Sequence, residues 1–87
     1  MRIEKVIKRN DGSRIKIEVN LYLPSLYRAD EKHEYNVMVC TCEKGKRTWK
    51  HIPDTGSGEE AIKLGLLVPD EIFQVKNELW EQIKPEL

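Results

Sequence analysis

At 87 residues, the chain is long enough for one domain with a modest core and too short for two. Its residues are 39% hydrophobic and 34% charged, and no apolar run approaches the roughly 18 residues that a membrane span requires. The two cysteines stand at positions i and i+2, which excludes a disulfide framework and favours a reducing, cytoplasmic setting. The N-terminal residues alternate charged and aliphatic side chains, unlike a signal peptide.

Net charge is zero, yet the charge is unevenly distributed along the chain. Residues 1–58 hold 12 Lys and Arg against 8 Asp and Glu, whereas residues 59–87 hold 3 against 7. The N-terminal part is therefore basic and the C-terminal part acidic. The fold decides whether this separation of charge also exists in space.

Residues 2–9 and 14–23 are predicted to form the first hairpin. In the second of these strands aliphatic residues occupy every odd position, so one face is expected to be buried. Asn10-Asp11-Gly12 is a strong turn signal between the two strands. A three-residue loop with a left-handed glycine places Ile7 opposite Ile15, and this register gathers the apolar side chains on one face.

Residues 24–34 are predicted to be a charged connection between the two hairpins. The segment is long for so small a domain. We therefore expect it to be a contact element, because long loops in compact domains are often functional.

Residues 35–43 and 46–52 are predicted to be the third and fourth strands. A three-residue loop, Glu43-Lys44-Gly45, would pair Val39 with Trp49 and direct both side chains toward the core. The opposite face of this hairpin would then carry a second set of side chains, namely Met38, Cys40, Cys42, Thr48 and Lys50.

Residues 53–58, with the sequence PDTGSG, are predicted to be a linker between the sheet and two helices. Ser57 followed by Glu60 predicts a capping box at the start of a short helix that Gly65 ends. A longer helix is predicted over about residues 70–84. Its apolar face is expected to contain Ile72, Phe73, Val75, Leu79, Trp80 and Ile83.

Together these elements predict one α+β domain over residues 1–87, with the sheet in 1–52 and the helices in 59–84. We expect a two-layer sandwich, in which a four-stranded, mostly antiparallel sheet carries a short helix and the C-terminal amphipathic helix on one face (ββββαα). The other face of the sheet is expected to be bare of helices.

Cys40 and Cys42 raise the question of a metal site or a reactive thiol. Zinc takes four ligands in a tetrahedral array, and the predicted register puts His51 on the opposite face of the sheet. The same placement separates the thiols from an activating imidazole, and the chain lacks the lysine and spacing of a phosphate-binding loop. We therefore predict no metal, no cofactor and no catalytic residue, and interpret the cysteines as small apolar side chains.

The third strand is apolar on both faces, which a strand buried on one side does not need. Either it is central and shielded by lysine stems, or it forms an interface. We expect a small non-enzymatic binding protein that acts by surface contact with a protein or nucleoprotein partner, with a homodimer left open. The expected contact residues are Lys16, Met38, Cys40, Lys44, Lys46, Arg47 and Lys50.

The alternative is a nucleic-acid-binding protein that uses the basic hairpin tips and the outer sheet face. Zero net charge and the acidic residues Glu4, Glu18 and Glu34 count against it. The small size and lack of chemical motifs are typical of inhibitors or accessory factors of phage or mobile elements, although no residue pattern specifies that role.

Overall fold

The computed structural model describes residues 2–22, 34–54 and 56–83. Its four strands form one antiparallel sheet in the order β1-β2-β3-β4, and two helices follow. This confirms the predicted α+β architecture. The predicted connection over residues 24–34 lies outside the described residues, except that Glu34 begins a strand. The elements are β1 (Arg2–Lys8), β2 (Arg14–Tyr22), β3 (Glu34–Cys42), β4 (Lys50–Ile52), α1 (Glu59–Lys63) and α2 (Pro69–Ile83).

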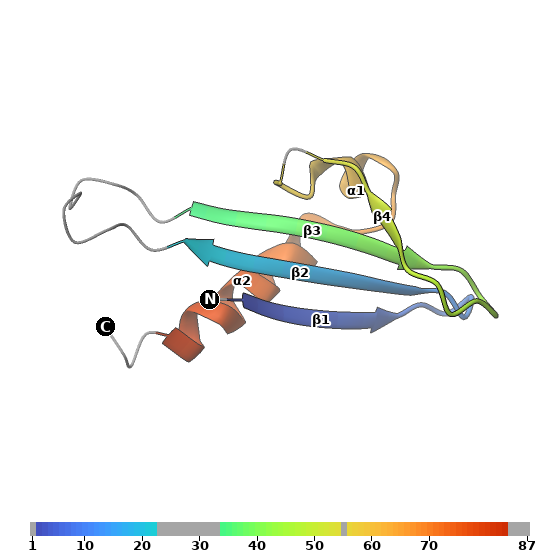
Figure 1. Ribbon diagram of the computed structural model, residues 1–87, viewed down its shortest axis with the longest axis horizontal. Coiled ribbons are helices and arrows are strands. Elements are labelled where there is room, and N and C mark those ends of the chain that lie inside the picture. Colours follow the sequence, from blue (N-terminus) through green and yellow to red (C-terminus); the bar gives the residue numbers. More distant parts are fainter. Residues whose placement is uncertain (1, 23–33, 55, 84–87) are drawn as a thin grey trace.

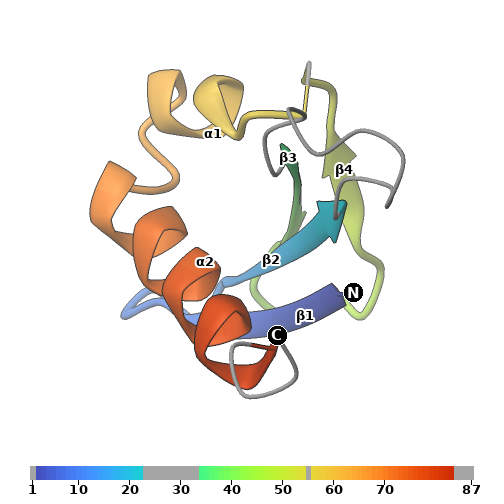
Figure 2. The same cartoon turned by 90° about the vertical axis from the view of Figure 1, so that its left-hand side faces the viewer.

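The molecule has two layers, with the sheet in one and both helices in the other (Figures 1 and 2). α2 runs diagonally across the inner face and packs on β1 and β2, whereas α1 lies near the β3 side. We call the opposite, helix-free side the outer face. No helix in the described ranges is both long and apolar enough to cross a bilayer.

The first hairpin has the predicted register. Ile7 stands opposite Ile15, and Ile3 stands opposite Val19. The loop closes where the Arg9 backbone N–H donates to the Ser13 carbonyl at 2.9 Å, and Gly12 has a φ of 91°, which favours glycine. The turn chemistry and the aliphatic alternation thus specify the same register.

The core lies between the inner face of the sheet and the two helices. β2 is its centre, because each of its inward-facing side chains is at most 3% exposed. The alternating aliphatic residues of β2 are therefore buried on one face, as the period-two pattern predicted. The core residues are Ile15, Ile17, Val19, Leu21, Val37, Val39, Ala61, Leu67, Ile72, Val75 and Leu79.

The predicted register of the second hairpin is wrong by three residues. Val39 pairs with Ile52 and Cys40 with His51, and β4 is confined to Lys50–Ile52. An odd shift moves every side chain of the strand to the other face. Ile52 therefore packs at the core in the place predicted for Trp49, and Trp49 lies on the outer face.

The short helix begins differently from the predicted capping box. Gly58, with a φ of 79°, is the N-cap of α1. As a glycine it has no side chain that could accept a capping hydrogen bond. Asp54 instead reaches in from the linker, where its carboxylate accepts the Glu60 N–H at 3.1 Å and the Ser57 hydroxyl at 3.3 Å. The carboxylate near the helix start satisfies an N–H that has no partner within the helix.

α2 begins one residue before the predicted start and buries a narrower face than predicted. Ile72, Val75 and Leu79 are buried, but Phe73 is 63% exposed. Phe73 lies at one margin of the apolar arc and Val75, which is 1% exposed, at the other, so the helix is turned with its Val75 side toward the core. The predicted core position of Phe73 is therefore wrong.

A partly buried ion pair joins the first hairpin to the start of α2. The Arg9 guanidinium donates to both carboxylate oxygens of Glu71 at 2.8 and 2.9 Å, and it also donates to the Leu66 carbonyl at 2.8 Å. One Glu71 oxygen accepts the Val68 N–H at 3.0 Å as well. One carboxylate thus fixes the hairpin, the segment before α2 and the first helical turn.

Candidate binding surface

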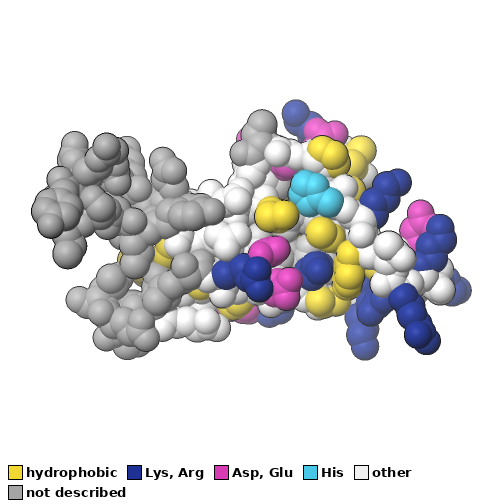
Figure 3. Space-filling model, in the orientation of Figure 1, with side chains coloured by type: hydrophobic (Ala, Val, Ile, Leu, Met, Phe, Trp, Pro, Cys, Tyr) yellow, Lys and Arg dark blue, Asp and Glu magenta, His cyan; other side chains and the backbone are white. Residues whose placement is uncertain are grey.

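The two hairpin tips lie beside each other at one end of the sheet. A Cβ added to Gly12 would stand 3.0 Å from Cγ of Lys44, so the Lys44 stem lies against the first turn. Residues 8–16 and 43–50 together hold eight Lys and Arg against two Asp and Glu. We call their cations the basic hairpin end, and Figure 3 shows Lys and Arg gathered there; they are Lys8, Arg9, Arg14, Lys16, Lys44, Lys46, Arg47 and Lys50.

Most cations of the basic hairpin end form no ion pair with the part of the chain that the structure describes. Arg9 is paired with Glu71, Lys46 with Glu43 at 2.8 Å, and Lys16 with Glu4 at 3.8 Å. The remaining five make no ion pair with any described residue. Positive charge is therefore free to act on a partner; these five are Lys8, Arg14, Lys44, Arg47 and Lys50.

Local acidic groups at this end are held ionised. Hydrogen bonds from the Ser13 hydroxyl and N–H lower the pKa of Asp11, with a smaller contribution from Lys44. A hydrogen bond from Lys46 lowers the pKa of Glu43, and the same bond raises the pKa of Lys46. These charges are fully exposed, so they change the surface potential more than the stability.

Trp49 links the basic hairpin end to the outer face. Its half-buried ring has the Lys16 ammonium 4.7 Å and the Arg14 guanidinium carbon 5.2 Å from its centroid. Cations at these distances are attracted to the negative face of the ring, by about 0.5–1 kcal/mol each at exposed sites. These contacts are a physical reason for Trp49 to lie outside the core.

The outer face brings together a thiol, an amine and an imidazole. Cys40 stands opposite Lys16 on one side and opposite His51 on the other. Directly opposite residues have Cβ atoms about 5 Å apart, yet no hydrogen bond joins the Cys40 sulfur to either neighbour in the described part of the chain. The predicted separation of His51 from the thiols is therefore wrong, because His51 and Cys40 are cross-strand neighbours on the outer face.

The second thiol is enclosed. Cys42 is 1% exposed, and its sulfur lies 3.3 Å from an Arg14 nitrogen and 3.0 Å from the Lys46 carbonyl oxygen, to which it donates. Segment 43–49 folds over this sulfur on the outer face, outside the helix-covered core. The prediction that both thiols face away from the helices therefore agrees with the strand pairing.

We expect the two thiols to differ sharply in reactivity with an aromatic disulfide reagent. Half-buried Cys40 should react in a fast phase, because a thiol needs access as well as ionisation. Cys42 should react in a slow phase that becomes fast in denaturant. The Cys40→Ser variant should lose the fast phase and Cys42→Ser the slow one; two equal fast phases would contradict the enclosure of Cys42.

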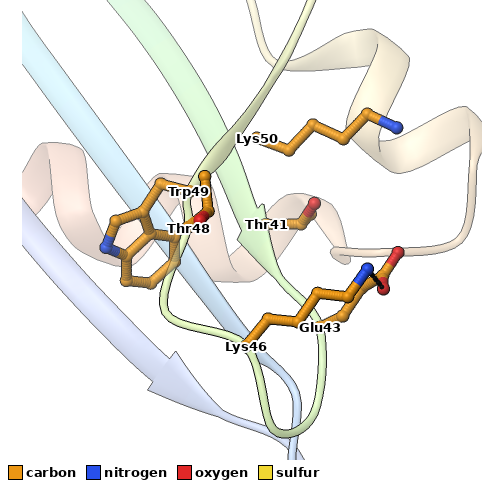
Figure 4. A pocket seen from close by; sticks show the side chains of 6 residues that line it. All are labelled: Thr41, Glu43, Lys46, Thr48, Trp49 and Lys50. Carbon is orange, nitrogen blue, oxygen red and sulfur yellow. Dashed lines mark ion pairs between the residues drawn. The ribbon is translucent and has the colours of Figure 1, made fainter.

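A shallow hollow of about 280 Å³ lies inside the bend of the second hairpin. In Figure 4 Lys50 and Thr41 point to one side of the ribbon and Trp49 to the other. The charged groups around the hollow are the paired Glu43 and Lys46 together with Lys50. A second hollow, of about 320 Å³, is lined by Asn36, Val37, Met38, His51, Asp54 and Gly56.

No three or more His, Cys, Asp or Glu side chains within the described ranges are placed to hold a metal ion. The hollow beside His51 holds an imidazole and a carboxylate, from His51 and Asp54. This hollow is open to solvent, so it suits the rim of a contact surface better than a ligand site, because ligand sites bury most of the bound molecule.

The predicted contact residues fall into three places. Lys16, Met38 and Cys40 are half-buried on the outer face, and Lys44, Lys46 and Arg47 are exposed in segment 43–49. Lys50 pairs with Thr41, so it lies on the opposite side of the sheet from Met38, where the predicted register had placed both together. The predicted contact residues left out Trp49 and His51, because their positions depend on that register, and also Arg14, which lies on β2 in the correctly predicted first hairpin.

Comparisons with protein-family models, with curated proteins and with solved structures find no match to this chain.

Proposed function

We propose that the protein is a non-catalytic binding protein that acts by surface contact with a protein or nucleoprotein partner. The contact consists of the basic hairpin end and the adjoining outer face around Met38 and Cys40. The observation that carries this proposal is that the two adjacent tips hold eight Lys and Arg against two Asp and Glu. Five of these eight cations have no ion pair with a described residue. The partner surface should therefore be acidic.

Apolar groups beside the cations support a protein partner. Met38 and Cys40 are half-buried, and Val6 on the same outer face is 47% exposed. Interfaces commonly place such groups at the centre and charges at the rim. We place the protein in the cytoplasm, where its two free thiols would stay reduced. No catalytic role is assigned to Cys40 and His51.

A matched pair of charge reversals tests the contact. Arg47 and Lys63 are both exposed, and neither has an ion pair with a described residue, but they lie on different parts of the fold. After a partner is captured from the native host, Arg47→Glu should weaken the complex about tenfold through like-charge repulsion, and Lys63→Glu should leave it unchanged. Equal affinities of the two variants in a titration would contradict the proposed surface.

Nucleic acid is the second candidate, because the Trp49 ring lies on the outer face at the basic hairpin end, with Arg14 and Lys16 against it. A salt titration with labelled single- and double-stranded DNA and RNA distinguishes the two. Phosphate contacts make log affinity fall by about 0.9 per neutralised phosphate for each unit of log salt. Binding to no oligonucleotide at about 50 mM salt would end this candidate.

A further inference from the structure

β1 is an edge strand, with β2 on one side and no described strand on the other (Figure 1). The Arg9 N–H donates to the Ser13 carbonyl, so the backbone groups of Arg9 face β2. In an antiparallel pair this orientation alternates along the strand, so the odd-numbered residues of β1 also face β2. The backbone N–H and C=O groups that point to the open edge therefore belong to Arg2, Glu4, Val6 and Lys8.

Such an edge can accept another strand unless its side chains prevent it. Lys5, on the inner face, would be protective, but its ammonium is turned to Glu78 of α2 at 2.6 Å. Val6, in the middle of the outward set, is 47% exposed. Lys8 makes no ion pair with a described residue of its own chain. The edge thus offers an apolar centre beside an available cation.

The charges on the edge select one register for a second copy. In an antiparallel pair with two-fold symmetry, a centre at Glu4 sets the two Glu4 side chains against each other, and a centre at Lys5 does the same with lysines. A centre at Val6 instead sets Glu4 of each copy opposite Lys8 of the other. Centres nearer the strand ends leave only three described residues of each β1 paired.

We propose that the protein self-associates through β1, as an antiparallel two-fold pair centred on Val6 with Glu4 opposite Lys8. The two four-stranded sheets then join into one continuous sheet, with both outer faces on the same side. This dimer is independent of the binding function proposed above. It places Val6 against Val6 and uses the outward backbone groups of residues 4, 6 and 8.

Sedimentation velocity under reducing conditions, from about 10 to 500 μM protein, tests the dimer by mass action. Glu4→Lys and Lys8→Glu should each weaken dimerisation about tenfold, because each variant turns two attractive pairs into two repulsive ones. The double variant should restore it. Val6→Lys should abolish the dimer, whereas Leu64→Lys, at an apolar site 57% exposed at the end of α1 on the β3 side of the fold, should not.

Amide hydrogen exchange gives a second readout that depends on the alternation. The dimer should slow exchange at the N–H groups of residues 4, 6 and 8 in the wild type and not in Val6→Lys, while residues 3, 5 and 7 stay protected in both. A wild-type protein that remains monomeric throughout would overturn the proposal. So would a dimer that survives Val6→Lys, or a double charge swap that fails to restore association.

Discussion

Replacing Gly58 by alanine is expected to destabilise the protein by about 2–5 kcal/mol, with about 1–2 from backbone strain and about 1–3 from overpacking. Gly58 has a φ of 79°, where an L-side chain is strained. A Cβ there would also stand 2.6 Å from Cδ1 of Ile72 and 3.2 Å from Cγ1 of Val37, both in the core. The glycine is needed because the start of α1 lies directly against Val37 of β3 and Ile72 of α2.

Gly45→Ala is the matched control for this substitution. Its φ of 78° is almost the same, but a Cβ there meets nothing within 4 Å. Urea unfolding should therefore give a loss of about 1–2 kcal/mol at Gly45, from strain alone, and a clearly larger loss at Gly58. Equal losses would mean that α1 shifts to accommodate the added Cβ without a loss of stability, and that the packing around Ile72 is not tight.

The two hairpins show when a register can be read from a sequence. In the first, the Asp-Gly turn and the aliphatic residues of both strands agree on the pairing that puts Ile7 opposite Ile15. In the second, either Trp49 or Ile52 can fill the inner position opposite Val39. The choice depends on contacts with a different strand, since the cations that meet the Trp49 ring come from β2.

The candidate surface, like the two hairpins, could be predicted only in part from the sequence. The lysines of segment 43–49 were expected at a tip because charged residues around Gly45 signal an exposed turn. The placement of Trp49 and His51 on the outer face was not, because a three-residue change in the β3–β4 register moves each cross-strand neighbour of that segment. The bond between Arg9 and Glu71 joins positions 62 apart in the sequence, and no local pattern announces it.

Loss of the Arg9–Glu71 pair is expected to make the protein less stable at neutral pH and less sensitive to acid. The Arg9 hydrogen bonds, helped by the Val68 N–H, hold the pKa of Glu71 below its ordinary value of 4.5, although desolvation acts in the opposite direction. The two side chains are only 31% and 20% exposed. Glu71→Gln should therefore cost about 1–2 kcal/mol at pH 7, within the range for hydrogen bonds to charged groups.

The sign of the pH dependence follows from the lowered pKa. Near pH 4 the unfolded chain binds more protons at Glu71 than the folded chain does, so stability from this group rises with pH there. The contribution is complete above 4.5 and disappears as the pH falls through the lower pKa of the folded state. The free-energy difference between wild type and Glu71→Gln should therefore shrink as the pH falls below 4.5 and through the lower pKa of the folded state.

Glu78→Gln is the control, because Glu78 also pairs with a β1 cation across the helix–sheet interface, at 2.6 Å from Lys5. That pair is 47% and 43% exposed, so its loss should cost at most about 0.5 kcal/mol. Urea unfolding of the three proteins at several pH values provides the measurement. If Glu71→Gln tracked Glu78→Gln at every pH, the partly buried pair would be no stronger than a surface contact, and α2 would be held on the sheet by apolar packing.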